Sequence, residues 1–274
     1  MPATGPAAST PQKQPTLFIP HGGGPCFFMD WPQTWDRMAA FLRGLSGTLP
    51  QKPDAIVVVS GHWEEQVATV MSAPKPGLIY DYYGFPPHTY TLQYPAPGSP
   101  ALAERIRALL ELAGLASAED SGRGFDHGVF IPFMLAFAQA DIPIVELSLL
   151  KTLDPAEHLA LGAALAPLRN TNVLIVGTGL SYHNLTHFMN GSPVTDQPAK
   201  EFDVWLTHAV CAPPPQRNQH LTHWTQAPGA RLCHPREEHL LPLMVAAGAA
   251  GQDYGQQIYS DTVLGKALSG YRFG

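Results

Sequence analysis

Short runs of β-branched and aliphatic residues, bounded by glycine or proline, recur along this chain. Examples are residues 16–20 (TLFIP), 55–60 (AIVVVS) and 172–182 (NVLIVGTGLSY). Two more runs cover residues 67–72 and 142–150. Runs of this length and composition predict the short, buried strands of a sheet.

Between these runs, apolar residues recur every three or four positions, which predicts helices. Two helices begin with capping signals: Ser99 stands before Pro100, and Asp154 stands before Pro155 with Glu157 three positions after the cap. Other predicted helices cover residues 31–45, 198–212 and 237–250. The alternation of strands and helices predicts an α/β fold, with a mainly parallel central sheet flanked by helices on both faces.

The chain length fits a single domain, although 274 residues lie near the upper limit for one hydrophobic core. Residues 1–14 are rich in proline, alanine, serine and threonine and lack an apolar signal core, so we expect a flexible tail and a catalytic domain over 15–274. No stretch approaches the roughly 20 apolar residues that span a bilayer. We therefore expect no membrane partner and a cytoplasmic location.

The formal net charge of −6, without a dense cluster of lysine and arginine, argues against a nucleic-acid partner and favours small molecules. The three cysteines form no CxxC pair, so we interpret them as reduced thiols and not as disulfides or zinc ligands. No coiled-coil seam is present, and the sequence leaves the oligomeric state open.

Three of the predicted strands lead to histidines, His21, His62 and His183. Because ligands of open α/β sheets bind beyond the carboxyl ends of the strands, these imidazoles should gather at one edge and suggest a metal site. His21 opens the turn HGGGP, which lacks the GxGxxG and GxxxxGK[ST] patterns of phosphate-binding loops. The missing pattern favours a metal over a phosphate.

A third ligand is expected from the segment CHPREEHLLPL, where Glu237, Glu238 and His239 stand at the predicted start of a helix. Spacing alone does not choose among the three. Two histidines and one carboxylate suit a non-haem ferrous ion, whereas three histidines with an open position also suit catalytic zinc. The residues by themselves leave the metal open.

Further histidines are candidates for acid–base chemistry, because imidazole titrates near working pH. His127 follows Asp126, and His183 and His187 stand four residues apart. That spacing resembles the HExxH motif, but Asn184 occupies the place of its glutamate base, which argues against a metalloprotease. We interpret His187 as a surface or packing residue of a helix.

Residues 79–98 form a stretch dense in proline and aromatic residues that has no helical period. Ordered loops of this length are commonly lids or binding loops, although packing of aromatic residues at the surface explains the composition equally well. The candidate pocket residues of this loop are Tyr80, Tyr82, Phe85, His88, Tyr90 and Tyr94.

Six segments occur in a fixed order over most of the chain: PHGGGP, VVVSGHW, GFPP with YPAPGSP, GFDHG, HNL and EEHLLPL. Together they resemble the extradiol ring-cleaving dioxygenases related to DOPA dioxygenase, within the superfamily of protocatechuate 4,5-dioxygenase catalytic subunits. The resemblance runs from about Thr16 to the C-terminus.

The resemblance implies that His21, His62 and His239 are metal ligands. It implies that His183 is the catalytic histidine facing the metal, with a fourth-ligand role left open, and that His127 is a second active-site histidine. Some relatives use a glutamate as third ligand, but the EHxxPL context resembles the branch that uses a histidine. Fe(II) is expected for activity, and Zn(II) is an alternative bound metal, because this branch has been described with both.

The implied reaction is cleavage of a catechol-type ring with O2 to give a semialdehyde, with His183 as the proton donor. Zinc has no redox chemistry and does not support this reaction. Two alternatives remain open: a zinc-dependent hydrolase that uses metal-activated water, and a non-catalytic protein that binds a ligand or peptide on the same scaffold. The sequence does not identify which catechol is the substrate or which bond of the ring is cleaved.

Overall fold

A computed structural model describes residues 12–31, 33–190 and 193–274. Most of the predicted tail lies outside these ranges, but its last residues are part of the fold. Lys13 pairs with Asp253 at 2.7 Å, and the buried Gln14 side chain donates a hydrogen bond to Asn172 Oδ1 at 2.7 Å. Lys13 and Gln14, which belong to the predicted tail, therefore contact the folded domain.

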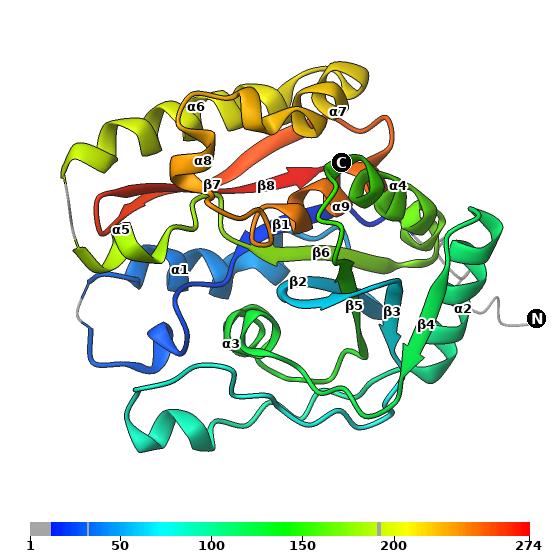
Figure 1. Cartoon of the computed structure of the whole chain (residues 1–274). Helices are drawn as coiled ribbons and strands as arrows, with labels where there is room; N and C mark the ends of the chain where they lie inside the picture. Colours follow the sequence, from blue (N-terminus) through cyan, green and yellow to red (C-terminus); the bar gives the residue numbers. More distant parts are fainter. Residues whose placement is uncertain (1–11, 32, 191–192) are drawn as a thin grey trace, which may run out of the picture.

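An eight-stranded sheet in the order β4-β3-β5-β2-β6-β1-β8-β7 forms the centre of the described residues (Figure 1). The four central strands β5, β2, β6 and β1 are parallel, whereas β3 pairs antiparallel with β5, and β8 pairs antiparallel with both β1 and β7. The strands are β1 (Thr16–Pro20), β2 (Ala55–Glu65), β3 (Ala68–Met71), β4 (Ser117–Asp120), β5 (Ile144–Leu150), β6 (Val173–Gly179), β7 (Gly255–Val263) and β8 (Lys266–Phe273).

Helices cover both faces of the sheet, which confirms the predicted α/β architecture. Helix α9 packs on β1, β2 and β6 together with α4, and α3 packs on the opposite side of β2 beside α1 (Figure 1). The helices are α1 (Asp36–Leu45), α2 (Pro100–Leu112), α3 (His127–Ala136), α4 (Pro155–Leu165), α5 (Leu185–Asn190), α6 (Asp196–Cys211), α7 (Pro214–Thr222), α8 (Ala230–Cys233) and α9 (Leu241–Ala250).

Both predicted helix caps are confirmed. The Ser99 side chain accepts a hydrogen bond from Leu102 N, and the Asp154 side chain accepts from the backbone amides of Ala156 and Glu157. These bonds satisfy amide groups that the first turn of a helix leaves without partners.

Glycines allow α4 and α9 to approach more closely than other residues would. A Cβ atom at Gly162 would lie 2.0 Å from the carbonyl oxygen of Val245, and one at Gly248 would lie 2.1 Å from that of Leu159. All of α9 is buried, because it lies between α4 and the sheet. This contact fixes the helix that follows the His239 turn.

Two sequence expectations need correction, and some elements were not predicted. Residues 237–240 form a turn, and α9 begins only at Leu241 because Pro242 occupies its first turn. Strand β2 continues to Glu65, so His62 lies within it and not after it. Helix α3 and the hairpin of β7 and β8 were not predicted at all.

In the part of the chain that the structure describes, no helix combines the length and apolar character that a bilayer span requires.

Candidate active site

The five candidate histidines converge from five separate elements. His21 follows β1, His62 lies in β2, His127 begins α3, His183 follows β6, and His239 lies in the turn before α9. The ring centroids of His21, His62 and His239 lie 4.7–5.1 Å apart. The ring of His127 lies 4.0 Å from that of His62, and the ring of His183 stacks on that of His239 at 3.4 Å.

A tight glycine turn aims the His21 ring. Gly22 has a φ of +81°, and a Cβ atom there would lie 2.3 Å from Cys26 Sγ. The chain therefore turns back under His21 only because residue 22 lacks a side chain. Burial raises the pKa of the Cys26 thiol, so this cysteine is an unreactive packing residue.

The turn that carries His239 packs directly on the ends of β2 and β6. A Cβ atom at Gly179 would lie 2.1 Å from the carbonyl oxygen of His239, and one at Gly61 would lie 3.1 Å from that of Glu238. Leu180 N donates a hydrogen bond to His239 O at 3.1 Å. These close contacts bring His239 to the same edge of the sheet as His21 and His62.

The nitrogens of three rings leave a place for a cation. His21 Nδ1 donates to Gly22 O at 2.8 Å, whereas its buried Nε2 has no hydrogen-bond partner among the described residues. His62 Nε2 and His239 Nε2 face each other at 3.2 Å. Two nitrogens that bind one ion at about 2.0–2.1 Å are separated by roughly 2.9–3.4 Å. The residues therefore fit a bound metal.

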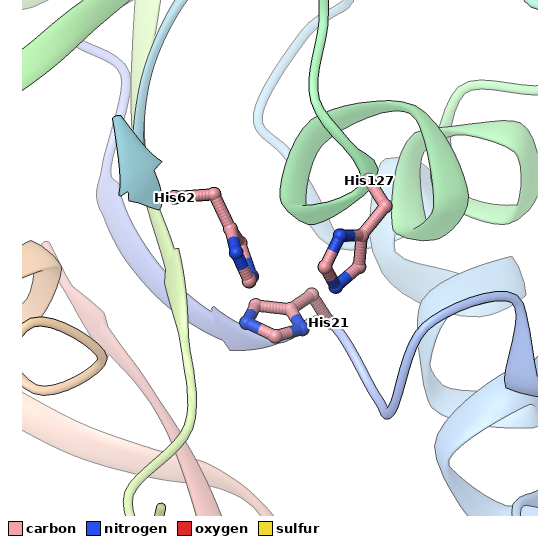
Figure 2. A group of neighbouring side chains, drawn as sticks. All are labelled: His21, His62 and His127. Carbon is pink, nitrogen blue, oxygen red and sulfur yellow. The ribbon is translucent and has the colours of Figure 1, made fainter. Parts of the chain in front are cut away.

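The positions of the ligand atoms define two neighbouring groups that could each hold a metal ion. The described residues contain one group of His21, His62 and His127, whose rings point toward one another in Figure 2, and a second group of His183, Glu238 and His239. The contact between His62 Nε2 and His239 Nε2 joins the two groups. Together they form one continuous cluster of five histidines.

The two glutamates that the sequence offered as ligands have other partners. Glu237 pairs with Arg231. Glu238 Oε1 accepts hydrogen bonds from His183 Nδ1 at 3.1 Å and from His239 Nδ1 at 3.0 Å. The geometry thus favours His239 as the third ligand of this segment.

Asp81, which lies in the aromatic loop, was not among the residues predicted from the sequence. Its Oδ1 accepts hydrogen bonds from His127 Nδ1 at 2.7 Å and from His127 N at 3.0 Å, and its Oδ2 lies 3.5 Å from His62 Nδ1. The sequence signal that could have identified Asp81 is that it is a single carboxylate within a stretch of aromatic residues.

The aromatic loop itself is held mainly by its own contacts. Tyr82 OH donates to Thr89 O, and the Tyr82 ring lies 5.7 Å from the ring of His127. Tyr80 and Tyr94 donate to backbone carbonyls away from the histidines. Among the six loop candidates, Tyr82 is the one with a described ring contact to the cluster.

Other sequence interpretations agree with the structure. His187 lies in α5 and its Nδ1 hydrogen-bonds to Tyr182 OH at 2.9 Å, which is a packing contact outside the cluster. All three cysteines are free.

Three imidazoles of the cluster, those of His21, His62 and His239, have lowered pKa values that keep them neutral. Burial is the main cause, and repulsion from neighbouring histidines adds to it: the pKa of His62 falls to about 4, and the pKa values of His21 and His239 fall well below the usual value. Burial alone would raise the pKa of Asp81, but its contacts with His127 and His62 outweigh this and lower that pKa to about 2. Neutral imidazole is the form that binds a metal.

Known proteins share this sequence and arrangement. Residues 16–271 match the family described as the catalytic LigB subunit of aromatic ring-opening dioxygenase. The chain is 40% identical to a Beta vulgaris protein named 4,5-DOPA dioxygenase extradiol, with 94% of this chain and 96% of the relative covered. It is 38% identical to dioxygenase tasH of Hapsidospora irregularis, with coverage of 95% and 85%.

A solved structure extends the likeness to the fold. The crystal structure of an uncharacterized Escherichia coli K12 protein is similar with a TM-score of 0.76 at 30% identity, over 95% of this chain and 100% of that chain. Together, the match over residues 16–271 and the relatives that span nearly the whole chain confirm the resemblance seen in the sequence. The chain belongs to the LigB family of metal-dependent, aromatic ring-opening dioxygenases, in the extradiol ring-cleaving class.

Proposed function

We propose that this protein cleaves the ring of a catechol with O2 by using Fe(II) held by His21, His62 and His239. The observation that carries the ligand set is the meeting of His62 Nε2 and His239 Nε2 at 3.2 Å, beside the unpartnered Nε2 of His21. At this distance two lone pairs repel each other, so the pair needs either a proton on one nitrogen or a cation between the two. A metal ion removes that repulsion and satisfies all three nitrogens.

When bound, Fe(II) supplies redox chemistry and open coordination positions for the two catechol oxygens and O2. The net reaction adds both atoms of O2 to the ring, breaks a ring carbon–carbon bond next to the diol, and gives a semialdehyde and a carboxylate. No external reductant is consumed, because the ring itself supplies the electrons.

The protein's own contribution is to move protons beside the substrate. We assign His127 as the base for a catechol hydroxyl, because its Nδ1 donates to Asp81 and its Nε2 is therefore free to accept a proton. Asp81 then stabilises the imidazolium that forms. With a pKa of about 2, Asp81 stays charged while it does so.

We assign His183 as the acid that returns a proton during ring opening. Its ring stacks on the proposed ligand His239, and its Nδ1 is held by Glu238 at 3.1 Å. The Glu238 carboxylate stabilises the protonated ring, in the same way that Asp81 supports His127. With its ring held in this stacked position, we assign His183 to proton transfer and not to a fourth coordination position.

The substrate class follows from the family, and DOPA is the first compound to test. A Beta vulgaris relative and an Escherichia coli relative, 40% and 33% identical, are both named 4,5-DOPA dioxygenase extradiol. The proposal includes a cytoplasmic location, where Fe(II) and free thiols are kept reduced.

Anaerobic reconstitution tests the proposal. The metal-free protein is loaded with Fe(II) or with Zn(II), mixed with DOPA, protocatechuate, homoprotocatechuate or catechol, and then exposed to oxygen. We expect oxygen uptake and a product heavier by the mass of O2 with Fe(II) alone. Absence of both with every catechol contradicts the proposed reaction, and equal turnover with Zn(II) contradicts the Fe(II) assignment.

A further inference from the structure

Two carboxylates join the proposed metal ligands to the proposed acid–base residues in the same way. Asp81 contacts the ligand His62 and the base His127, and Glu238 contacts the ligand His239 and the acid His183. Each carboxylate therefore touches one histidine of each kind.

The contacts of Asp81 involve the same ring atom of both histidines. His127 Nδ1 donates to Oδ1 at 2.7 Å, and His62 Nδ1 lies 3.5 Å from Oδ2. The backbone amide of His127 also donates to Oδ1 at 3.0 Å, which anchors the carboxylate to the start of α3. Only a quarter of the Asp81 side chain is exposed.

The contacts of Glu238 follow the same pattern through a single oxygen. His183 Nδ1 and His239 Nδ1 both donate to Oε1, at 3.1 and 3.0 Å, while their rings stack at 3.4 Å. The other oxygen, Oε2, lies 3.5 Å from Arg236 Nη1, and Arg236 is itself paired with Glu64. Arg236 therefore faces the carboxylate from the side away from the histidines.

A carboxylate decides which nitrogen of a neutral imidazole carries the proton. An ionised carboxylate only accepts hydrogen bonds, so a ring nitrogen beside it must carry the hydrogen. The second nitrogen, Nε2, is then unprotonated, and its lone pair is available for a metal ion or a proton. Four histidines in this site have their Nδ1 atom beside a carboxylate.

We propose that Asp81 and Glu238 are positioning residues that fix the Nδ1-protonated form of His62, His127, His183 and His239. The proposal rests on the proposed function for the division of these histidines into ligands and acid–base residues. One carboxylate controls a ligand and its neighbouring proton carrier together, so loss of either carboxylate weakens metal binding and proton transfer at once. Neither carboxylate coordinates the metal.

Substitution by the matching amide tests this role with little change in shape. In Asp81→Asn, one carboxylate oxygen becomes an NH2 group, which donates and no longer accepts. Either His127 Nδ1, which donates to Asp81, or His62 Nδ1, which lies 3.5 Å from it, must then face a donor, and this favours a proton on Nε2 of that ring. For Glu238→Gln, the negative charge shared by His183 and His239 disappears. Removal of a carboxylate that supports a metal-bound histidine typically weakens metal binding by about 10–100-fold.

Two measurements that need no turnover report the effect. Competition with a chelator gives the affinity for Zn(II), and long-range proton–nitrogen NMR spectra of the metal-free protein show which nitrogen of each ring is protonated. We expect about 10–100-fold weaker Zn(II) binding for both variants, and a change of protonated nitrogen at His62 or His127 in Asp81→Asn. Circular dichroism confirms that each variant is folded.

Glu237→Gln is the matched control. Glu237 is the neighbour of Glu238 in the sequence, but its carboxylate pairs with Arg231 and contacts none of the four rings. It should bind Zn(II) as the wild type does. The proposal is overturned if either amide variant, correctly folded, keeps wild-type Zn(II) affinity, or if the wild-type rings carry their protons on Nε2. A wild-type protein that shows the expected affinities and tautomers but cleaves no catechol would instead contradict only the proposed function.

Discussion

The substitution Gly179→Ala should disrupt the site more than it weakens the fold. Gly179 ends β6, pairs with Pro20 of β1 and accepts a hydrogen bond from His21 N at 3.2 Å. A Cβ atom there would lie 2.1 Å from the carbonyl oxygen of His239, whereas such contacts are essentially never shorter than 3.0 Å. The turn that carries His239 must therefore move by about 1 Å.

The expected loss of folding stability has two local contributions. Forcing one methyl group into a packed site costs about 1–3 kcal/mol. If the displacement also breaks the bond from Leu180 N to His239 O, a further loss of about 1 kcal/mol is expected. For a chain of this size each kcal/mol lowers the melting temperature by about 2–4 °C, so a decrease of about 2–16 °C is expected. A 1 Å displacement of a catalytic group lowers the rate by about 10²-fold. The substitution should therefore affect turnover more strongly than folding stability.

Thermal unfolding, Zn(II) competition and ring cleavage, measured on the same preparations, check this prediction. Gly44→Ala is the control: Gly44 lies in α1, and a Cβ atom there meets nothing within 4 Å. Because alanine favours a helix, this control should be at least as stable as the wild type. If Gly179→Ala kept both its melting temperature and its Zn(II) affinity, the close approach would not constrain His239 and the reasoning would be refuted.

Three further predictions concern proton transfer, pH and the support of α9. His183→Ala should abolish ring cleavage but retain the metal in elemental analysis, because His183 is assigned to proton transfer; loss of the metal would make it a ligand. The metal-free protein should lose stability in urea unfolding as the pH falls from about 6.5 to 4. Burial holds the folded pKa of His62 at about 4 and that of His234 at about 3, so the unfolded chain binds more protons in this range. A flat profile would contradict this. Arg217→Met should cost about 1–3 kcal/mol in the same assay, because the buried carbonyl of Ala247 and the partly buried carbonyls of Gly251 and Asp253 lose their donor; a loss below about 1 kcal/mol would contradict it.

Local sequence signals predicted the strands and helices whose formation depends on neighbouring residues in the sequence. The five apolar runs became β1, β2, β3, β5 and β6, and the caps at Ser99 and Asp154 begin α2 and α4. The hairpin of β7 and β8 was missed because its turn, Leu264 and Gly265, lacks the usual Asn-Gly or Asp-Gly signal, although both residues have positive φ. Helix α3 was missed because it is almost entirely apolar, and thus shows no amphipathic period.

The sequence by itself identified three histidines, His21, His62 and His183, through the apolar runs that lead to them, and all five through the family resemblance. Spacing alone did not choose among Glu237, Glu238 and His239, because neighbouring residues in a turn differ only in the direction of their side chains, and only the family resemblance favoured His239. That choice depends on the packing of the turn against Gly179 and Gly61, which lie far from it in sequence.

The tertiary structure alone decided how the histidines are supported. Asp81 lies 46 residues before His127, and Glu238 lies 55 residues after His183, so no short motif contains either pair. The sequence determined which chemical groups are present, because strands and glycine turns are specified locally. The fold determined which ring nitrogen each group faces, because that depends on how distant segments pack together.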